Sequence, residues 1–175
     1  PDSQTMPINL YGESKLAGEE AVLSVPGAKA IIVRIPVLYA YDCEDLGESA
    51  SLVIAKSLLS KLPTTVDDWG KRFPTLVDDI SQILRLVIDA TMREEDPISG
   101  VRLHVSSPEQ CTKYELVKIM AEIVGVDASH IQPNSNQPAG APRPQNTQLD
   151  CTETWKVLGM EHAYEFTSIR DGMKK

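Results

Sequence analysis

The chain has 175 residues, of which 42% are hydrophobic and 24% are charged, and its formal net charge is −8. This is the composition of an ordinary globular protein, and the length allows one domain with a real core. The acidic balance argues against a nucleic-acid partner or an anionic membrane surface, because both require a basic patch. No apolar run approaches the roughly 18 residues of a membrane-spanning helix, so we expect no membrane insertion.

The cysteine residues are few and widely spaced. Cys43, Cys111 and Cys151 include no Cys-x-x-Cys pair, which favours three reduced thiols in a cytoplasmic protein. The three histidines are equally scattered, so the sequence predicts no metal site.

The first predicted element is an amphipathic helix at residues 11–25, preceded by an extended, proline-containing approach. Its apolar residues, among them Leu16 and Leu23, share one face. Its acidic residues, among them Glu19, are expected to point to water.

Tyr11 and Lys15 lie four residues apart in this helix, so their side chains share one helical surface. An ammonium group beside a phenol favours the phenolate, and such a tyrosine can exchange a proton with a carbonyl or an alcohol during hydride transfer. The spacing alone is a weak signal, because Tyr114 and Lys118 repeat it. Context favours the first pair, since a turn and a short strand follow it and no comparable strand follows the second.

Residues 30–35 form an apolar run that ends at Arg34 and is typical of a strand covered on both faces. The loop Pro36–Leu38 follows. A helix, a buried strand and a loop at the carboxyl end of that strand are how an open α/β sheet presents a nucleotide-binding crevice. Taken without that context, Pro36 is equally well a simple strand end.

The remaining elements are predicted from periodicity and capping signals. Helices are expected at residues 49–62, 78–93, 112–125 and 152–158, and strands at 101–105 and 130–132. Asp78 or Asp79 is expected to cap the second of these helices, and Thr112 with Glu115 forms a capping box at the third. His104 is expected on the polar face of its strand, as a surface histidine.

Three connecting segments are ambiguous. The acidic segment 40–49 is expected to be a solvated loop rather than a cation site. Residues 64–77 are extended, and the segment 69–74 either lines a pocket or packs a small lobe. The loop 133–144 contains four prolines, and loops of this length are usually functional or disordered.

Four strings carry a family resemblance. Leu10–Val22 and Arg34–Tyr39 resemble the extended short-chain dehydrogenase/reductase superfamily, in particular the branch that contains dTDP-4-dehydrorhamnose reductase. Trp69–Val77 and Gly140–Cys151 are similar to the regulatory beta subunits of methionine adenosyltransferase, which lie in that branch. The resemblance covers nearly the whole chain.

The resemblance implies an α/β fold, namely the carboxyl-terminal part of a Rossmann-type extended short-chain dehydrogenase/reductase fold with a small α/β substrate lobe. Residues 1–39 would end the dinucleotide-binding domain. Residues 40–175 would form mostly the small lobe, with some segments returning to the Rossmann sheet. The superfamily's glycine-rich fingerprint is absent from the sequence. We therefore expect this chain to be the carboxyl-terminal half of a longer protein whose other half holds the pyrophosphate site.

The resemblance also implies site residues. Tyr11 and Lys15 would bind the cofactor, NADP or NAD, and in a reductase they would be the proton donor and the ribose anchor. The nicotinamide end of the cofactor would touch Pro36, Val37 and Leu38. Arg143 is the substrate-side candidate, because a guanidinium suits a phosphate, although it is equally suited to pairing with acidic neighbours.

Two functions are consistent with the sequence. The first is a regulatory, non-catalytic subunit that binds NADP(H) and a catalytic methionine adenosyltransferase subunit and modulates S-adenosylmethionine synthesis. The second is an NAD(P)H-dependent reductase of a dTDP-4-dehydrorhamnose-type sugar nucleotide. The strings at 69–77 and 140–151 favour the regulator, and the intact Tyr11–Lys15 pair is compatible with both.

Overall fold

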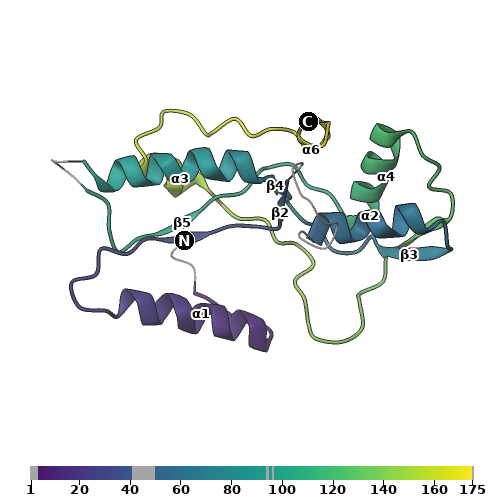
Figure 1. Ribbon diagram of the computed structural model, residues 1–175. Coiled ribbons are helices and arrows are strands. Elements are labelled where there is room, and N and C mark those ends of the chain that lie inside the picture. The colour runs from purple at the N-terminus through teal and green to yellow at the C-terminus, as the bar shows by residue number, and fades with distance from the viewer. Residues whose placement is uncertain (1–3, 41–49, 94, 96, 175) are drawn as a thin grey trace.

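The computed structural model describes residues 4–40, 50–93, 95 and 97–174. In chain order its elements are α1 (Leu10–Leu23), β1 (Ile32–Arg34), β2 (Leu38–Tyr39), α2 (Ala50–Ser60), β3 (Thr64–Asp67), β4 (Thr75–Leu76), α3 (Val77–Thr91), β5 (Arg102–His104), α4 (Lys113–Val124), β6 (Ile131–Asn134), α5 (Thr152–Val157) and α6 (Ile169–Gly172) (Figure 1). The predicted segment 40–49 lies, apart from its first residue, outside the described residues. No helix in the described part of the chain is long and apolar enough to cross a membrane.

The strands of the described residues pair in parallel. β1 pairs with β5, β2 with β4 and β3 with β6, and Val33 lies opposite Leu103 in the first pair. Parallel pairing requires long crossover connections, so each pair joins segments that are far apart in the sequence. The predicted α/β class is confirmed.

The β1–β5 pair lies between two helices, with α1 on one side and α3 on the other (Figure 1). Helix α3 buries one apolar stripe against β5 and α5. The buried side chains of this core are Ile80, Ile83, Val87, Ala90, Leu103, Val105, Trp155 and Leu158. The first strand is less enclosed than predicted. Although helices flank both sides of the pair, all three residues of β1 are half-buried, and among the described residues this strand has a strand partner on one edge only.

A second core joins α2, α4, β3 and β6. Its buried side chains are Leu58, Val66, Val117, Ala121, Ala128 and Ile131. Helix α6 attaches the end of the described chain to this part, since Ile169 packs on Cys111 and Leu116. The Tyr39 hydroxyl donates to the carbonyl of Ser168 at 3.3 Å and ties the same segment to β2.

The capping box predicted for α4 is confirmed. The Thr112 hydroxyl accepts from the Glu115 amide at 3.1 Å, and the Glu115 carboxylate accepts from the Thr112 amide at 2.7 Å. Gly125 ends the helix with φ 69°, in the left-handed conformation that a residue without Cβ adopts at low cost.

The predicted aspartate cap of α3 is wrong. Leu76 occupies the cap position, and no side chain caps the helix. The Asp79 carboxylate is buried and accepts three hydrogen bonds from residues far along the chain: from the Tyr164 hydroxyl at 3.2 Å, the Thr167 amide at 2.8 Å and the Thr167 hydroxyl at 3.0 Å. This carboxylate therefore holds the distant segment 164–167 on α3, which helical periodicity does not reveal.

Candidate functional site

Helix α1 begins at an asparagine cap. The Oδ1 atom of Asn9 accepts from the Gly12 amide at 2.8 Å, which satisfies one of the free amides of the first turn. A Cβ at Gly12 would lie 3.2 Å from the Cβ of Pro7, so the glycine lets the approaching chain fold closely against the helix start. These contacts fix the turn that carries Tyr11.

Tyr11 and Lys15 lie over the same surface of α1. The Nζ atom of Lys15 is 5.7 Å from the centroid of the Tyr11 ring, a cation–π distance. The Tyr11 side chain is 71% exposed, and no residue of α1 is buried. Both side chains are therefore presented to the outside of the described structure rather than packed in it.

Glu19 anchors the other end of α1, and the expectation that it points to water is wrong. Its carboxylate accepts from Nε and Nη2 of Arg34 on β1 at 2.8 and 2.7 Å, and from Nε of Arg102 on β5 at 3.3 Å. The Glu19 side chain is 15% exposed. The side-chain hydrogen bonds from Arg34 and the positive charges lower the pKa of Glu19. The apolar periodicity of α1 does not reveal this contact, because the partners of Glu19 are arginines on two strands, β1 and β5.

His104 is half-buried rather than a plain surface histidine. Its Nδ1 atom lies 3.1 Å from the carbonyl oxygen of Asp150, and its Nε2 atom lies 3.5 Å from Nη1 of Arg34. Burial lowers the pKa of His104. His104 therefore connects Arg34, the partner of Glu19, with the backbone just before α5.

The predicted nicotinamide-side loop lies at the carboxyl end of β1. Pro36, Val37 and Leu38 are half-buried, and Leu38 begins β2. The carbonyl of Val37 accepts from the Thr75 amide at 3.1 Å. Val37 also lines a small cavity of about 70 Å³.

This small cavity brings together segments that the sequence left ambiguous. Arg72 and Pro74 line it with Cys111 and Leu116, whereas Phe73 is buried and is not part of the lining. Burial raises the pKa of the Cys111 thiol to about 12, so the thiol is protonated at neutral pH. The residues that line the cavity are mostly apolar, and Arg72, Thr112 and Lys113 are its polar ones.

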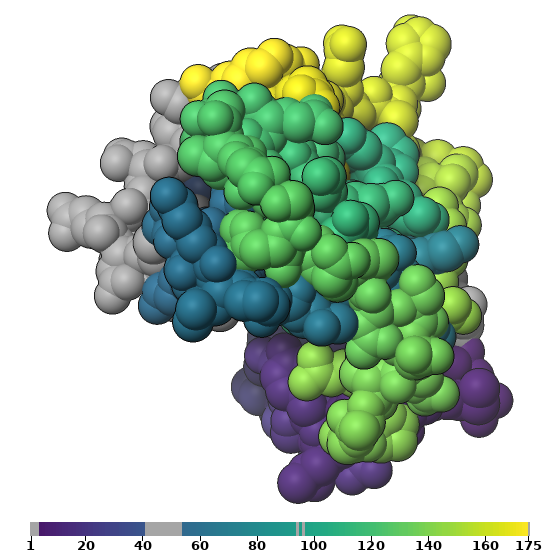
Figure 2. All heavy atoms as spheres, turned by 90° about the vertical axis from the view of Figure 1, so that its right-hand side faces the viewer, coloured from purple at the N-terminus to yellow at the C-terminus, as the bar shows by residue number. Residues whose placement is uncertain are grey.

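Arg143 is exposed, but the loop that carries it, residues 141–145 (the Arg143 loop), is held by hydrogen bonds on either side of Arg143. The Nδ2 atom of Asn9 donates to the carbonyl of Pro142 at 2.8 Å, and Nη1 of Arg72 donates to the carbonyl of Pro144 at 3.2 Å. The Lys71 amide donates to the carbonyl of Gln145 at 2.6 Å. Figure 2 shows this loop, in green, against the purple amino-terminal segment. The structure thus brings the Arg143 loop to the start of the helix that carries Tyr11 and Lys15.

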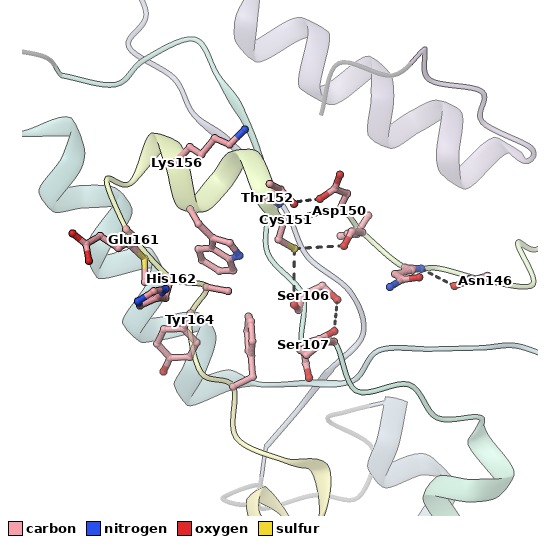
Figure 3. Close-up of a pocket in the computed structure, with 17 residues that line it drawn as sticks. Ser106, Ser107, Asn146, Asp150, Cys151, Thr152, Lys156, Glu161, His162 and Tyr164 are labelled. Carbon is pink, nitrogen blue, oxygen red and sulfur yellow. Dashed lines mark hydrogen bonds between the residues drawn. The ribbon is translucent and has the colours of Figure 1, made fainter.

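A larger hollow of about 990 Å³ lies elsewhere, between the chain around α5, the residues after β5 and the segment 160–166 (Figure 3). None of the predicted site residues lines it. Trp155 and Phe166 form part of its wall, with ring centroids 6.1 Å apart. Helical spacing gives no signal for this hollow, since its lining comes from several segments, α5 among them, that are separate in the sequence.

Several polar groups of this hollow are engaged in contacts within the protein. The Ser106 hydroxyl donates to the carbonyl of Ser107, and the Cys151 thiol lies near two carbonyls (Figure 3). Burial raises the pKa of the Cys151 thiol, and burial with the nearby Asp79 charge raises that of Tyr164 to about 12. Neither group is poised as a base or nucleophile at neutral pH. No cluster of metal-ligand side chains occurs within the described ranges.

The parallel strand pairs and the helices that flank them define an α/β domain of the Rossmann type. The chain belongs to the RmlD substrate binding domain family, whose model matches residues 1–171.

Among curated proteins, the chain is similar to methionine adenosyltransferase 2 subunit beta of Xenopus tropicalis, with 42% identity over 89% of this chain and 46% of that protein. It is also similar to a dTDP-4-keto-6-deoxy-D-glucose reductase of Streptomyces niveus, with 30% identity over 94% of this chain and 54% of that protein. The chain spans about half the length of these relatives.

Among solved structures, the chain resembles dTDP-4-dehydrorhamnose reductase from Bacillus anthracis in complex with NADP, with a TM-score of 0.76. The match covers 99% of this chain and 55% of that one, at 22% identity, and it shows the Rossmann-type reductase fold.

Proposed function

We propose that this chain is part of a regulatory beta subunit of methionine adenosyltransferase, which binds a nicotinamide dinucleotide and modulates S-adenosylmethionine synthesis by binding the catalytic subunit. The observation that carries the proposal is the 42% identity to a protein named as that subunit, against 30% to a sugar-nucleotide reductase. The difference favours the regulator over the reductase.

The geometry of the predicted site fits a dinucleotide. Tyr11 and Lys15 are exposed on one surface, and Lys15 takes part in no ion pair between described residues. An unpaired ammonium is suited to hydrogen-bonding a ribose hydroxyl, and the adjacent phenol offers a second donor. Pro36, Val37 and Leu38 would contact the nicotinamide end, as expected for the loop after β1. When bound, the cofactor supplies hydride-transfer chemistry, which a regulator leaves unused.

Arg143 fits an anionic group on the substrate side. Its guanidinium has no ion-pair partner among the described residues, so the alternative of pairing with acidic neighbours has no support there. A free guanidinium presents several donors in the geometry that phosphate and carboxylate oxygens accept.

The first test of this function is association. The full-length protein is passed over a size-exclusion column with light scattering, alone and mixed with a catalytic methionine adenosyltransferase subunit. We expect a co-eluting complex at micromolar concentration. Two separate peaks would favour the reductase over the regulator.

The second test is dinucleotide affinity, for which the chain supplies its own control. Lys15→Met is expected to weaken NADPH binding about tenfold or more, because a hydrogen bond to a charged donor contributes about 1.5–3 kcal/mol. Lys118→Met removes a lysine at the same spacing from a tyrosine on α4 and should leave the affinity unchanged. Equal affinities for Lys15→Met and the unmodified protein, measured by calorimetry, would contradict the proposed role of Lys15.

The alternative function is an NAD(P)H-dependent reductase of a dTDP-4-dehydrorhamnose-type substrate. It is favoured by the 30% identity to the Streptomyces niveus reductase and by the adjacent Tyr11 and Lys15. Tyr11→Phe would then lower turnover of a dTDP-4-keto-6-deoxy sugar by about a hundredfold, the scale of a lost general acid, while Tyr114→Phe would not. Absence of keto-sugar-dependent cofactor oxidation in the full-length protein would exclude the reductase.

A further inference from the structure

Asn9 makes two hydrogen bonds in two directions. Its Oδ1 atom accepts from the Gly12 amide at 2.8 Å, inside the first turn of α1. Its Nδ2 atom donates to the carbonyl of Pro142 at 2.8 Å, in a loop 133 residues further along the chain. Tyr11 follows this asparagine by two residues, and Arg143 follows that carbonyl by one. One amide group therefore links the two halves of the predicted site.

The Arg143 loop has no other hydrogen bond to α1 among the described residues. Its other hydrogen bonds run to the 71–72 segment: the Lys71 amide donates to the carbonyl of Gln145, and the Arg72 guanidinium donates to the carbonyl of Pro144. Without the Asn9 bond, the loop would remain attached to the 71–72 segment and lose its attachment to the helix. The distance between the Tyr11–Lys15 surface and Arg143 would then be unconstrained on the helix side.

We infer that Asn9 is a positioning residue, which holds the Arg143 loop against the start of α1 so that Tyr11, Lys15 and Arg143 face one bound ligand. The inference rests on the proposed dinucleotide site and adds to it a physical link between the cofactor side and the substrate side. A ligand that moves the first turn of α1 moves the Arg143 loop with it.

The two bonds of Asn9 can be separated by substitution. Asn9→Asp keeps an oxygen that caps the helix, since aspartate and asparagine cap about equally well, but it has no N–H to donate to Pro142. Asn9→Ser also keeps a capping oxygen, adds no charge and is too short to replace the amide. Asn134→Asp is the matched control, because its Oδ1 atom accepts from the Asn136 amide and the substitution adds the same charge.

The test is backbone ¹⁵N relaxation on the perdeuterated full-length protein, read at the amides of Ala141 and Arg143, which flank Pro142. In the unmodified protein and in Asn134→Asp we expect order parameters of about 0.85, the value of rigid backbone. In Asn9→Asp and Asn9→Ser we expect them to fall below about 0.6, while the melting temperature stays within about 2 °C because the cap is kept. Order parameters that stay high in both Asn9 variants would overturn the inference.

A second measurement tests whether Asn9 links the cofactor side of the site to the Arg143 loop. Saturation of the full-length protein with NADP⁺ is expected to shift the Arg143 amide resonance, and this shift should be lost in Asn9→Asp and Asn9→Ser. A shift that persists unchanged in both variants contradicts the link. If NADP⁺ binds to no form of the protein, the proposed dinucleotide site fails, and the ligand-free order parameters alone decide whether Asn9 holds the loop.

Discussion

Helices α1 and α4 both carry a tyrosine followed four residues later by a lysine, yet they are built in opposite ways. Helix α4 is stabilised from within by its capping box and by the buried side chains Leu116, Val117 and Ala121. Helix α1 buries no residue and is held by hydrogen bonds and ion pairs at its two ends, at Asn9 and Glu19. The same Tyr-x-x-x-Lys spacing thus occurs once on a helix that packs into the core and once on a helix whose side chains are exposed.

The difference shows what a short motif needs in order to carry chemistry. Tyr114 is half-buried and packs against the apolar cluster of α2, β3 and β6. Tyr11 is exposed beside Lys15, on a helix fixed by contacts that leave that surface uncovered. A fixed backbone with uncovered side chains favours ligand binding, because less conformational entropy is lost when the ligand binds.

The largest expected effect is a core deletion in α4. Leu116 is 3% exposed, and Leu116→Ala should lower the free energy of unfolding by about 3 kcal/mol, through lost burial and a residual cavity. Leu10 lies in the first turn of α1 and is 79% exposed, so Leu10→Ala should change that free energy by less than about 0.5 kcal/mol. Urea unfolding of the 175-residue chain measures both. Similar losses for the two leucines would mean that α1 is packed as α4 is.

The capping contacts of α4 come next. Thr112 is buried, caps the helix and donates to Oδ1 of Asp68 at 2.7 Å. Thr112→Ala should cost about 2 kcal/mol in the same unfolding measurement, since a cap and a buried hydrogen bond are lost together. Thr112→Ser restores the hydroxyl and should recover most of the loss. Failure of serine to do so would assign the effect to the lost methyl group instead.

The ion pairs of α1 have a smaller effect that depends on pH. Glu19→Gln should cost about 1 kcal/mol at neutral pH, whereas the exposed neighbour in Glu20→Gln should cost almost nothing. The folded-state pKa of Glu19 is lowered by Arg34, so the unfolded chain binds the proton more readily. The stabilisation is therefore present above the unfolded pKa of about 4.3 and is lost as the pH falls through the folded value.

The check on this prediction is the difference in unfolding free energy between the unmodified chain and Glu19→Gln, measured from pH 7 down to pH 3. It should shrink as the pH falls below about 4.3. A difference that is constant over this range would mean that the charge of Glu19 does not contribute, and that the side chain acts by packing alone.

Much of this architecture follows from the sequence. Periodicity and capping chemistry predicted all of the longer helices, because apolar spacing and the Thr112–Glu115 box are local signals. The contacts of Glu19, Asp79 and Asn9 could not be predicted, since each joins a polar side chain to a partner distant in sequence. From the sequence alone, a carboxylate in a helix is predicted to face solvent, and only the tertiary structure shows the arginine or the amide that it contacts.

The smallest expected effect lies at the motif itself. The Lys15 ammonium faces the Tyr11 ring at 5.7 Å, and an exposed contact of this kind contributes about 0.5 kcal/mol. Lys15→Met should therefore lower the free energy of unfolding of the 175-residue chain by no more than that, as should Lys118→Met on α4. If the loss for Lys15→Met reached about 2 kcal/mol, this lysine would be part of the scaffold of α1, and a weaker affinity for NADPH in that variant would follow from a disturbed helix. A small loss in stability together with a tenfold loss in affinity would separate the two helices by function, because only α1 would then carry a lysine whose effect appears with the ligand.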